Sequence, residues 1–131
     1  MKKENLLNPE LVAAVAKIGH TDYFCIADCG LPIPLGVECI DVSVSAGIPG
    51  FLEVLKAIES ELVIESYIYA DEIEKKNPKL MEGIGKILNA KPAKSVSHEE
   101  FKKLNSKSKT IVRTGEASPY ANIILIGGVN F

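Results

Sequence analysis

Tryptophan is absent from the sequence, and its 131 residues include only two histidines and three cysteines. An odd number of cysteines does not build a disulfide framework, and Cys25 lies in an apolar run where a free thiol packs as a small hydrophobic group. A reducing compartment, the cytoplasm, is therefore expected. Because 47% of the residues are hydrophobic and 24% are charged, we predict one folded domain over residues 1–131 that needs no metal ion or disulfide for stability.

Long apolar segments and strongly charged segments are also missing. The longest apolar run, 123–129, has seven residues with two glycines, whereas a membrane-spanning helix needs about 20 residues. The start is lysine-rich like a signal peptide, but Glu10 and Lys17 interrupt the apolar region that would have to follow. The formal net charge is -2 and no basic block is present, which argues against nucleic acid as a partner. We expect a soluble protein that is not exported.

Motifs for nucleotides and for metal ions are incomplete. The stretch 83–85 has two glycines but lacks the third glycine and the preceding strand of a dinucleotide fingerprint, and no Gly-Lys-Ser/Thr loop exists, so neither NAD nor ATP is expected. Cys25 and Cys29 are four positions apart, unlike the cysteines of a zinc knuckle. We therefore predict no cofactor and no metal. A metal site assembled from distant loops by His20, Asp28 and His98 stays open as an alternative.

Helical and strand-like patterns alternate along the chain. The spacing predicts helices at 8–18, 51–58, 71–88 and 99–107, and strands at 23–27, 38–44, 62–70, 93–97, 110–113 and 122–126. This order indicates an α/β fold in which helices flank a mainly parallel central sheet, in layers like those of the Rossmann fold. Such sheets bind ligands outside the carboxyl ends of their strands. That rule selects the loops at His20, Asp28, His98 and 114–122, which we expect to share one edge of the sheet.

Histidine and aspartate are the first candidates for chemistry in these loops. An imidazole titrates near neutral pH and can act as acid or base, although a loop histidine is more often a surface or capping group. His20 follows a predicted helix and His98 a predicted strand. Asp28 ends a wholly apolar run, where a carboxylate needs partners, so a functional role is favoured. For Asp22 we prefer the role of a turn residue.

Two further features remain ambiguous from the residues alone. Lys102 lies one helical turn after His98 and can share a pocket with it, whereas the neighbouring lysines are typical of a solvated helix face. The run 113–122 is rich in hydrogen-bonding groups and lies between two predicted strands. Composition does not decide between an ordinary hairpin, a crossover loop and a binding loop.

Three segments together resemble a known family. They are Gly19-His20-Thr21-Asp22, Ile26-Ala27-Asp28-Cys29-Gly30-Leu31-Pro32-Ile33-Pro34 and Arg113-Thr114-Gly115-Glu116-Ala117-Ser118-Pro119-Tyr120-Ala121-Asn122. These motifs and their spacing resemble the D-ribose pyranase family over nearly the whole chain. L-fucose mutarotases share the Gly-His and Tyr-Asn elements but usually not the block that follows Asp28, so ribose is preferred over fucose. Ser118 stands where threonine is common, and Gly127, Gly128 and Asn130 give a less regular tail.

The resemblance implies a site and an assembly. His20 would be the proton donor, Asp28 and His98 would contact the sugar, and Tyr120, Ala121 and Asn122 would complete the binding site. The resemblance also implies a ring-shaped oligomer, in which two pentamers stack into a decamer. In such rings the C-terminal loop of one subunit helps to build the site of its neighbour. The implied activity is a cofactor-independent isomerase that interconverts the pyranose and furanose forms of D-ribose.

The chemistry agrees with this assignment. Opening a pyranose removes a proton from the anomeric hydroxyl and delivers one to the ring oxygen, and closing to the furanose repeats this on other oxygens. A group that titrates near neutral pH can do both. Lys102, Tyr120 and Asn122 are expected to hold sugar hydroxyls. Three alternatives stay open: a noncatalytic cytoplasmic ribose-binding accessory protein, an L-fucose-type mutarotase and the metal-dependent enzyme.

Overall fold

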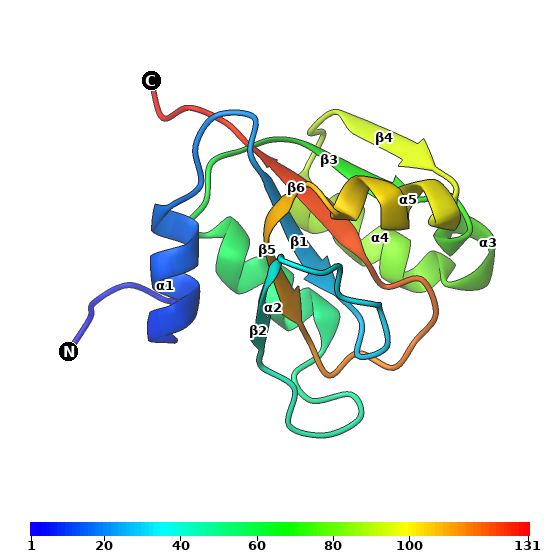
Figure 1. Cartoon of the computed structure of the whole chain (residues 1–131), viewed down its shortest axis with the longest axis horizontal. Coiled ribbons are helices and arrows are strands. Elements are labelled where there is room, and N and C mark those ends of the chain that lie inside the picture. The colour runs from blue at the N-terminus through cyan, green and yellow to red at the C-terminus, as the bar shows by residue number, and fades with distance from the viewer.

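Six strands form one twisted sheet through the molecule (Figure 1). The computed structural model describes all residues 1–131. In spatial order the strands are β2 (Glu38–Asp41), β5 (Ser108–Arg113), β1 (Tyr23–Ala27), β6 (Ile123–Gly127), β3 (Ile64–Ala70) and β4 (Ala93–Val96). Strand β5 is parallel to both β2 and β1, and β3 is parallel to β4. Only β6 is antiparallel to its neighbours, β1 and β3.

The sheet is therefore mixed: β6 alone runs against the other strands, so most of the sheet has the common direction predicted for it. The loop 114–122 connects the end of β5 to the start of β6. It stays at the end of the sheet where β5 finishes and does not cross to the end where β5 begins. A parallel crossover needs a dozen or more residues, and this loop is too short for one. The loop is also no simple hairpin, because β1 lies between β5 and β6. It passes over the carboxyl end of β1.

Helices cover both faces of the sheet, as predicted for an α/β layer structure. Alternate residues of β1 point to opposite faces: Phe24 and Ile26 join the larger apolar cluster, whereas Cys25 and Ala27 join the smaller one. The larger cluster includes residues of α1 (Pro9–Ala16), α2 (Phe51–Glu59), α3 (Ile73–Lys76) and α4 (Pro78–Leu88). The smaller one includes Phe101 of α5 (His98–Asn105). None of these helices has the length and apolar character needed to cross a membrane.

Capping residues and a proline set several element boundaries, some of them as predicted and others not. Asn8 caps α1 by accepting hydrogen bonds from the next two available N–H groups, as its pattern indicates. The predicted helix 71–88 is two helices, because Pro78 has no N–H to continue α3 and instead starts α4. Ser97 accepts a hydrogen bond from Glu100 and caps α5. His98 is consequently the first residue of a helix and not a loop residue.

Candidate functional site

Asp28 and Asn122 make a reciprocal pair where β1 ends and β6 begins. The side-chain oxygen of Asn122 accepts the N–H of Asp28 at 2.9 Å, and its amide nitrogen donates to the Asp28 carboxylate at 2.8 Å. A further hydrogen bond of 2.9 Å reaches this carboxylate from the N–H of Gly30. Asn122 is fully buried, whereas Asp28 is half-buried. The fold thus holds the Asp28 carboxylate rigidly at the carboxyl edge of the sheet, with one side open to solvent.

The loop 114–122 is tied across the end of β1 and brings its polar groups to Asp28. Thr114 donates both its N–H, at 2.9 Å, and its hydroxyl, at 2.8 Å, to the carbonyl of Ala27. The N–H of Cys29 donates to the carbonyl of Glu116 at 2.9 Å. The Glu116 carboxylate in turn accepts the N–H of Phe51, the first residue of α2, at 2.9 Å. These bonds connect three segments that are distant in sequence.

His98 and Tyr120 face each other beside this pair. Their ring centroids are 5.1 Å apart and the rings are nearly perpendicular, at 81°. Tyr120 has a φ of 56°, a left-handed conformation that is uncommon for residues other than glycine and that clusters at functional sites. The Nδ1 atom of His98 is buried and has no hydrogen-bond partner in the protein. A buried polar atom without a partner requires an explanation, and a bound ligand is one.

Two carboxylates that sequence analysis did not select, Asp71 and Glu72, follow β3, and one of them contacts His98. Glu72 accepts the backbone N–H of His98 with both oxygens, at 3.0 and 3.1 Å. The hydrogen bond with Glu72 raises the pKa of Asp71. Burial acts to raise the pKa of Glu72, but its hydrogen bonds, one from His98 among them, outweigh burial and lower this pKa. The available signal was an acidic pair directly after β3, at the carboxyl end of a parallel strand.

Lys102 and Ala121 are both engaged within the chain. Lys102 follows His98 by one turn of α5 and therefore lies on the same helix face, but its ammonium group binds Glu99 at 2.7 Å. The side chain of Ala121 is fully buried in the core. Neither the side chain nor the backbone of Ala121 is exposed in the single chain.

His20 lies in a tight turn, 19–22, just before the amino end of β1, whereas Asp28 lies at its carboxyl end. The Asp22 carboxylate accepts the N–H of Gly19 at 2.7 Å and binds Lys109 at 2.7 Å. The hydrogen bond from Lys109, and then that from Gly19, lower the pKa of Asp22. Thr21 adopts a φ of 69°, which is an outlier for a β-branched residue. Asp22 thus acts as the turn residue that its sequence context predicts, and the turn presents the half-exposed His20 side chain to solvent.

The prediction that His20 shares one edge of the sheet with Asp28 and His98 is wrong for the single chain. His20 precedes β1 and Asp28 follows it. Since a strand rises about 3.3 Å per residue, the ends of this five-residue strand lie about 13 Å apart. The structure brings together Asp28, His98, Tyr120 and Asn122, with Lys102 nearby. The alternative metal site of His20, Asp28 and His98 is consequently not formed within one chain.

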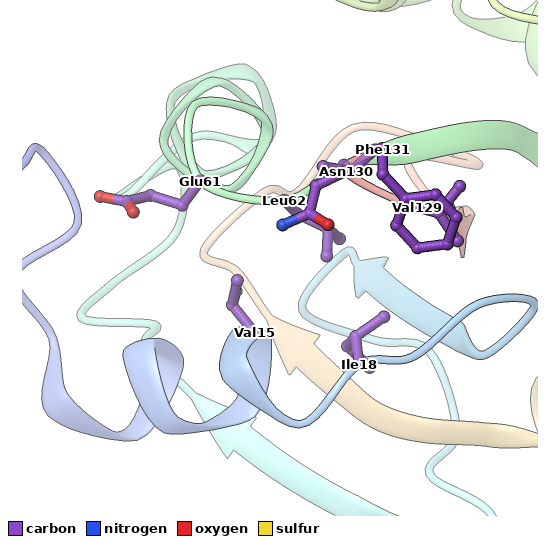
Figure 2. A pocket seen from close by; sticks show the side chains of 9 residues that line it. Val15, Ile18, Glu61, Leu62, Val129, Asn130 and Phe131 are labelled. Atoms are coloured by element: carbon purple, nitrogen blue, oxygen red, sulfur yellow. The ribbon is translucent and has the colours of Figure 1, made fainter.

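A cavity of about 270 Å³, lined by both apolar and polar groups, lies beside the His20 turn (Figure 2). Val15 and Ile18 come from the end of α1 and the residues after it, while Val129 and Phe131 come from the C-terminal tail. Phe131 is fully exposed and Val129 is partly exposed. The cavity contains neither Asp28 nor His98. The amino edge of the sheet therefore offers His20 next to an uncovered apolar surface.

Comparisons with known proteins agree on one family. Residues 1–130 match the RbsD / FucU transport protein family. The D-ribose pyranase of Geobacillus thermodenitrificans is 50% identical over 131 residues, which cover 100% of this chain and 99% of that relative. The structure of Bacillus subtilis RbsD complexed with D-ribose is 41% identical, with a TM-score of 0.97 and 100% coverage of both chains.

A more distant solved structure shares the fold. The fucose mutarotase of Streptococcus pneumoniae in complex with L-fucose is 24% identical, with a TM-score of 0.82 over 95% of this chain and 94% of that one. The predicted resemblance to the D-ribose pyranases is confirmed by the nearer relatives. On its full-length match to the family and to these relatives, the chain belongs to the RbsD / FucU transport protein family.

Proposed function

We propose that the protein is a cytoplasmic D-ribose pyranase, which interconverts the pyranose and furanose forms of D-ribose by acid/base catalysis without a cofactor. The observation that carries the proposal is the rigid Asp28 and Asn122 pair beside His98 and Tyr120. It occurs in a chain 41% identical, over its full length, to an RbsD that was solved with D-ribose. This cluster offers a carboxylate, an imidazole and a phenol to one small polyol.

The roles in binding follow from burial and from hydrogen-bonding capacity. Asp28 accepts hydrogen bonds from sugar hydroxyls on its open side, while buried Asn122 holds it in place. His98 uses its unpartnered Nδ1 and Tyr120 its hydroxyl toward the sugar. Buried Ala121 supports the cluster from the core, and Lys102 can leave Glu99 for the substrate. Each sugar hydroxyl that loses water on binding thereby finds a partner.

The proton donor, His20, comes from a second copy of the chain in this proposal. His20 and Asp28 lie at opposite edges of the sheet, so a head-to-tail arrangement places the His20 edge of one copy on the Asp28 edge of the next. Such an interface uses two different surfaces, and it forms a ring when the rotation from one copy to the next closes, in line with the pentamers and decamers that the resemblance implies. Exposed apolar side chains support contact at both edges: Val44 and Ile48 after β2, and Val63, Val129 and Phe131 beside His20.

The proton transfers balance across this shared site. Asp28 or His98 accepts the proton of the anomeric hydroxyl as His20 gives one to the ring oxygen, and the bond between the ring oxygen and the anomeric carbon breaks. The open-chain aldehyde then closes through a different hydroxyl, which returns a proton to His20. The aldehyde oxygen is protonated by Asp28 or His98 at the same time. Positioned acid/base groups of this kind contribute roughly 10²- to 10⁴-fold each.

Saturation-transfer NMR of ribose at equilibrium tests the proposal. The protein should accelerate exchange between ring forms, and His20→Ala and Asp28→Asn should each slow this exchange at least 100-fold while the oligomer stays intact. Repeating the experiment with L-fucose distinguishes the fucose-type alternative, which requires faster exchange of fucose than of ribose. Exchange of ribose at the uncatalysed rate in the presence of the wild-type protein would refute the proposal.

A noncatalytic ribose-binding accessory protein is the second candidate. It is favoured by one observation, namely that the carboxyl-edge cluster assembles in one chain without His20. Calorimetry separates the two functions when it is combined with the exchange experiment. Ribose binding with no acceleration of exchange would support the accessory protein.

A further inference from the structure

The His20 side chain is engaged by a carboxylate from a distant part of the chain. Its Nε2 atom lies 2.6 Å from the carboxylate of Glu65, the second residue of β3 and 45 positions away in sequence. Both side chains are about half exposed in the single chain. The contact is therefore formed by the fold and not by a local turn.

Two consecutive glycines at the end of β6 make this approach possible. A Cβ atom on Gly127 would collide with the carbonyl oxygen of Gly19, and one on Gly128 would lie 3.3 Å from the Cβ and the backbone nitrogen of Glu65. Gly127 also exchanges backbone hydrogen bonds with the turn, accepting the N–H of Thr21 at 2.9 Å. Because these two glycines carry no side chain, the His20 turn and the start of β3 can both pack against the end of β6.

The hydrogen bond to Glu65 determines which nitrogen of His20 is free. In a neutral imidazole one nitrogen carries the proton and the other accepts, and a carboxylate partner places the proton on the nitrogen that faces it. Here the carboxylate faces Nε2, so Nδ1 is left to exchange a proton with a substrate. A side chain without this partner could rotate and could adopt either tautomer.

We propose that Glu65 is the positioning residue of His20, holding Nε2 so that Nδ1 faces the sugar and stabilising the imidazole when it is charged. This inference rests on the proposed function, in which His20 gives a proton to the ring oxygen. The proton given to the sugar leaves Nδ1, while the proton on Nε2 stays in its hydrogen bond with Glu65. Nδ1 then regains a proton from the hydroxyl that closes the furanose ring. Glu65 itself touches no reacting atom.

The pair should matter for catalysis more than for stability. An exposed ion pair contributes little to folding, because water screens it and two flexible side chains must be ordered. When a neighbouring copy covers His20, water leaves the site and the attraction between imidazolium and carboxylate strengthens. At metal sites, removing the carboxylate that orients a histidine typically costs about 10- to 100-fold in activity, and we take the same range for this pair.

Glu65→Gln tests the inference, with Glu82→Gln as the matched control. Glu82 is also exposed and also forms an ion pair, with Lys86 at 3.2 Å, but it lies on α4. We expect ribose exchange in Glu65→Gln to slow by about 10- to 100-fold at saturating ribose, with little change in the ribose concentration that half-saturates the rate. Glu82→Gln should exchange at the wild-type rate. Imidazole ¹⁵N spectra of the neutral side chain should show His20 protonated on Nε2 in the wild type and a mixture of tautomers in Glu65→Gln.

Each other outcome has a distinct meaning. Wild-type exchange in Glu65→Gln, with slow exchange in His20→Ala, overturns the role of Glu65 and leaves the proposed function intact. Wild-type exchange in His20→Ala removes His20 from the mechanism, and the role of Glu65 with it. Slow exchange in Glu65→Gln together with a dissociated oligomer overturns the positioning role as well, because the pair would then be an interface contact.

Discussion

His20 and Asp28 stand at the two ends of the same strand, β1, and so face opposite edges of the sheet. Hydrogen bonds fix the position of each residue: Asp22 and Gly127 hold the turn that contains His20, and buried Asn122 holds the Asp28 carboxylate. Neither end of the sheet alone contains both His20 and Asp28, which the proposed ribose reaction uses as proton donor and as sugar-binding carboxylate. A chain that presents half a site at each end can complete the site by contact with another copy.

Mixing two inactive variants should restore activity if the site is shared between copies. A copy with Asp28→Asn still presents His20, and a copy with His20→Ala still presents Asp28. In rings assembled at random from equal amounts of both, about one quarter of the head-to-tail interfaces join an intact His20 to an intact Asp28. Ribose exchange measured by NMR should therefore recover to about a quarter of the wild-type rate after the two proteins are refolded together.

Separate refolding of each variant, followed by mixing without subunit exchange, is the control for this experiment. No recovery in the jointly refolded sample, when its rings are shown to contain both variants, would mean that His20 and Asp28 act within one chain or not at all.

Asn122→Ala should weaken both stability and sugar binding. The buried amide satisfies the backbone N–H and the carboxylate of Asp28, and its removal leaves both without that partner, at a cost of about 1–3 kcal/mol. Urea unfolding should show this loss, and calorimetry should show weaker ribose binding. The exposed Asn5, changed to Ala, should alter neither quantity. Unchanged stability in Asn122→Ala would contradict the buried pair.

Gly127→Ala should displace the His20 turn. The added methyl group would meet the carbonyl of Gly19 and the side chain of Ile18, and forced overpacking of this kind costs about 1–3 kcal/mol. Ribose exchange should slow along with the loss of stability measured by thermal unfolding. Gly85→Ala is the control: its position on α4 is open, and alanine should stabilise the helix by up to about 1 kcal/mol. Equal effects at both positions would be inconsistent with a turn held by Gly127.

Lys109→Gln should raise the pKa of Asp22. The hydrogen bond from Lys109 is the largest cause of the lowered pKa, and the N–H of Gly19 is the next. A carboxyl whose folded pKa is lowered stabilises the fold at pH values above its unfolded pKa, near 3.9, and this contribution is lost as the pH falls through the folded pKa. Carboxyl NMR titration should place the Asp22 midpoint lower in the wild type than in Lys109→Gln. Coincident midpoints would contradict the contact.

Much of the fold and of the candidate site can be predicted from short-range patterns in the sequence. The strand at 23–27 follows from its unbroken apolar run, and the helix at 51–58 follows from the glycines before it and its apolar spacing, since these periods reflect one element at a time. The motifs around His20, Asp28 and Tyr120 were likewise sufficient to indicate the family. Such inferences need no knowledge of which segments meet.

What the tertiary structure decided is how these local pieces meet. Only the strand order makes β6 antiparallel and puts His20 at the edge away from Asp28. The partners Glu65 of His20 and Glu72 of His98 are 45 and 26 positions away in sequence, beyond any local period. The glycines 127 and 128 look like an irregular tail until Gly19 and Glu65 are seen packed against them. Pairing between distant segments depends on sheet topology and on close packing, which no single stretch of sequence encodes.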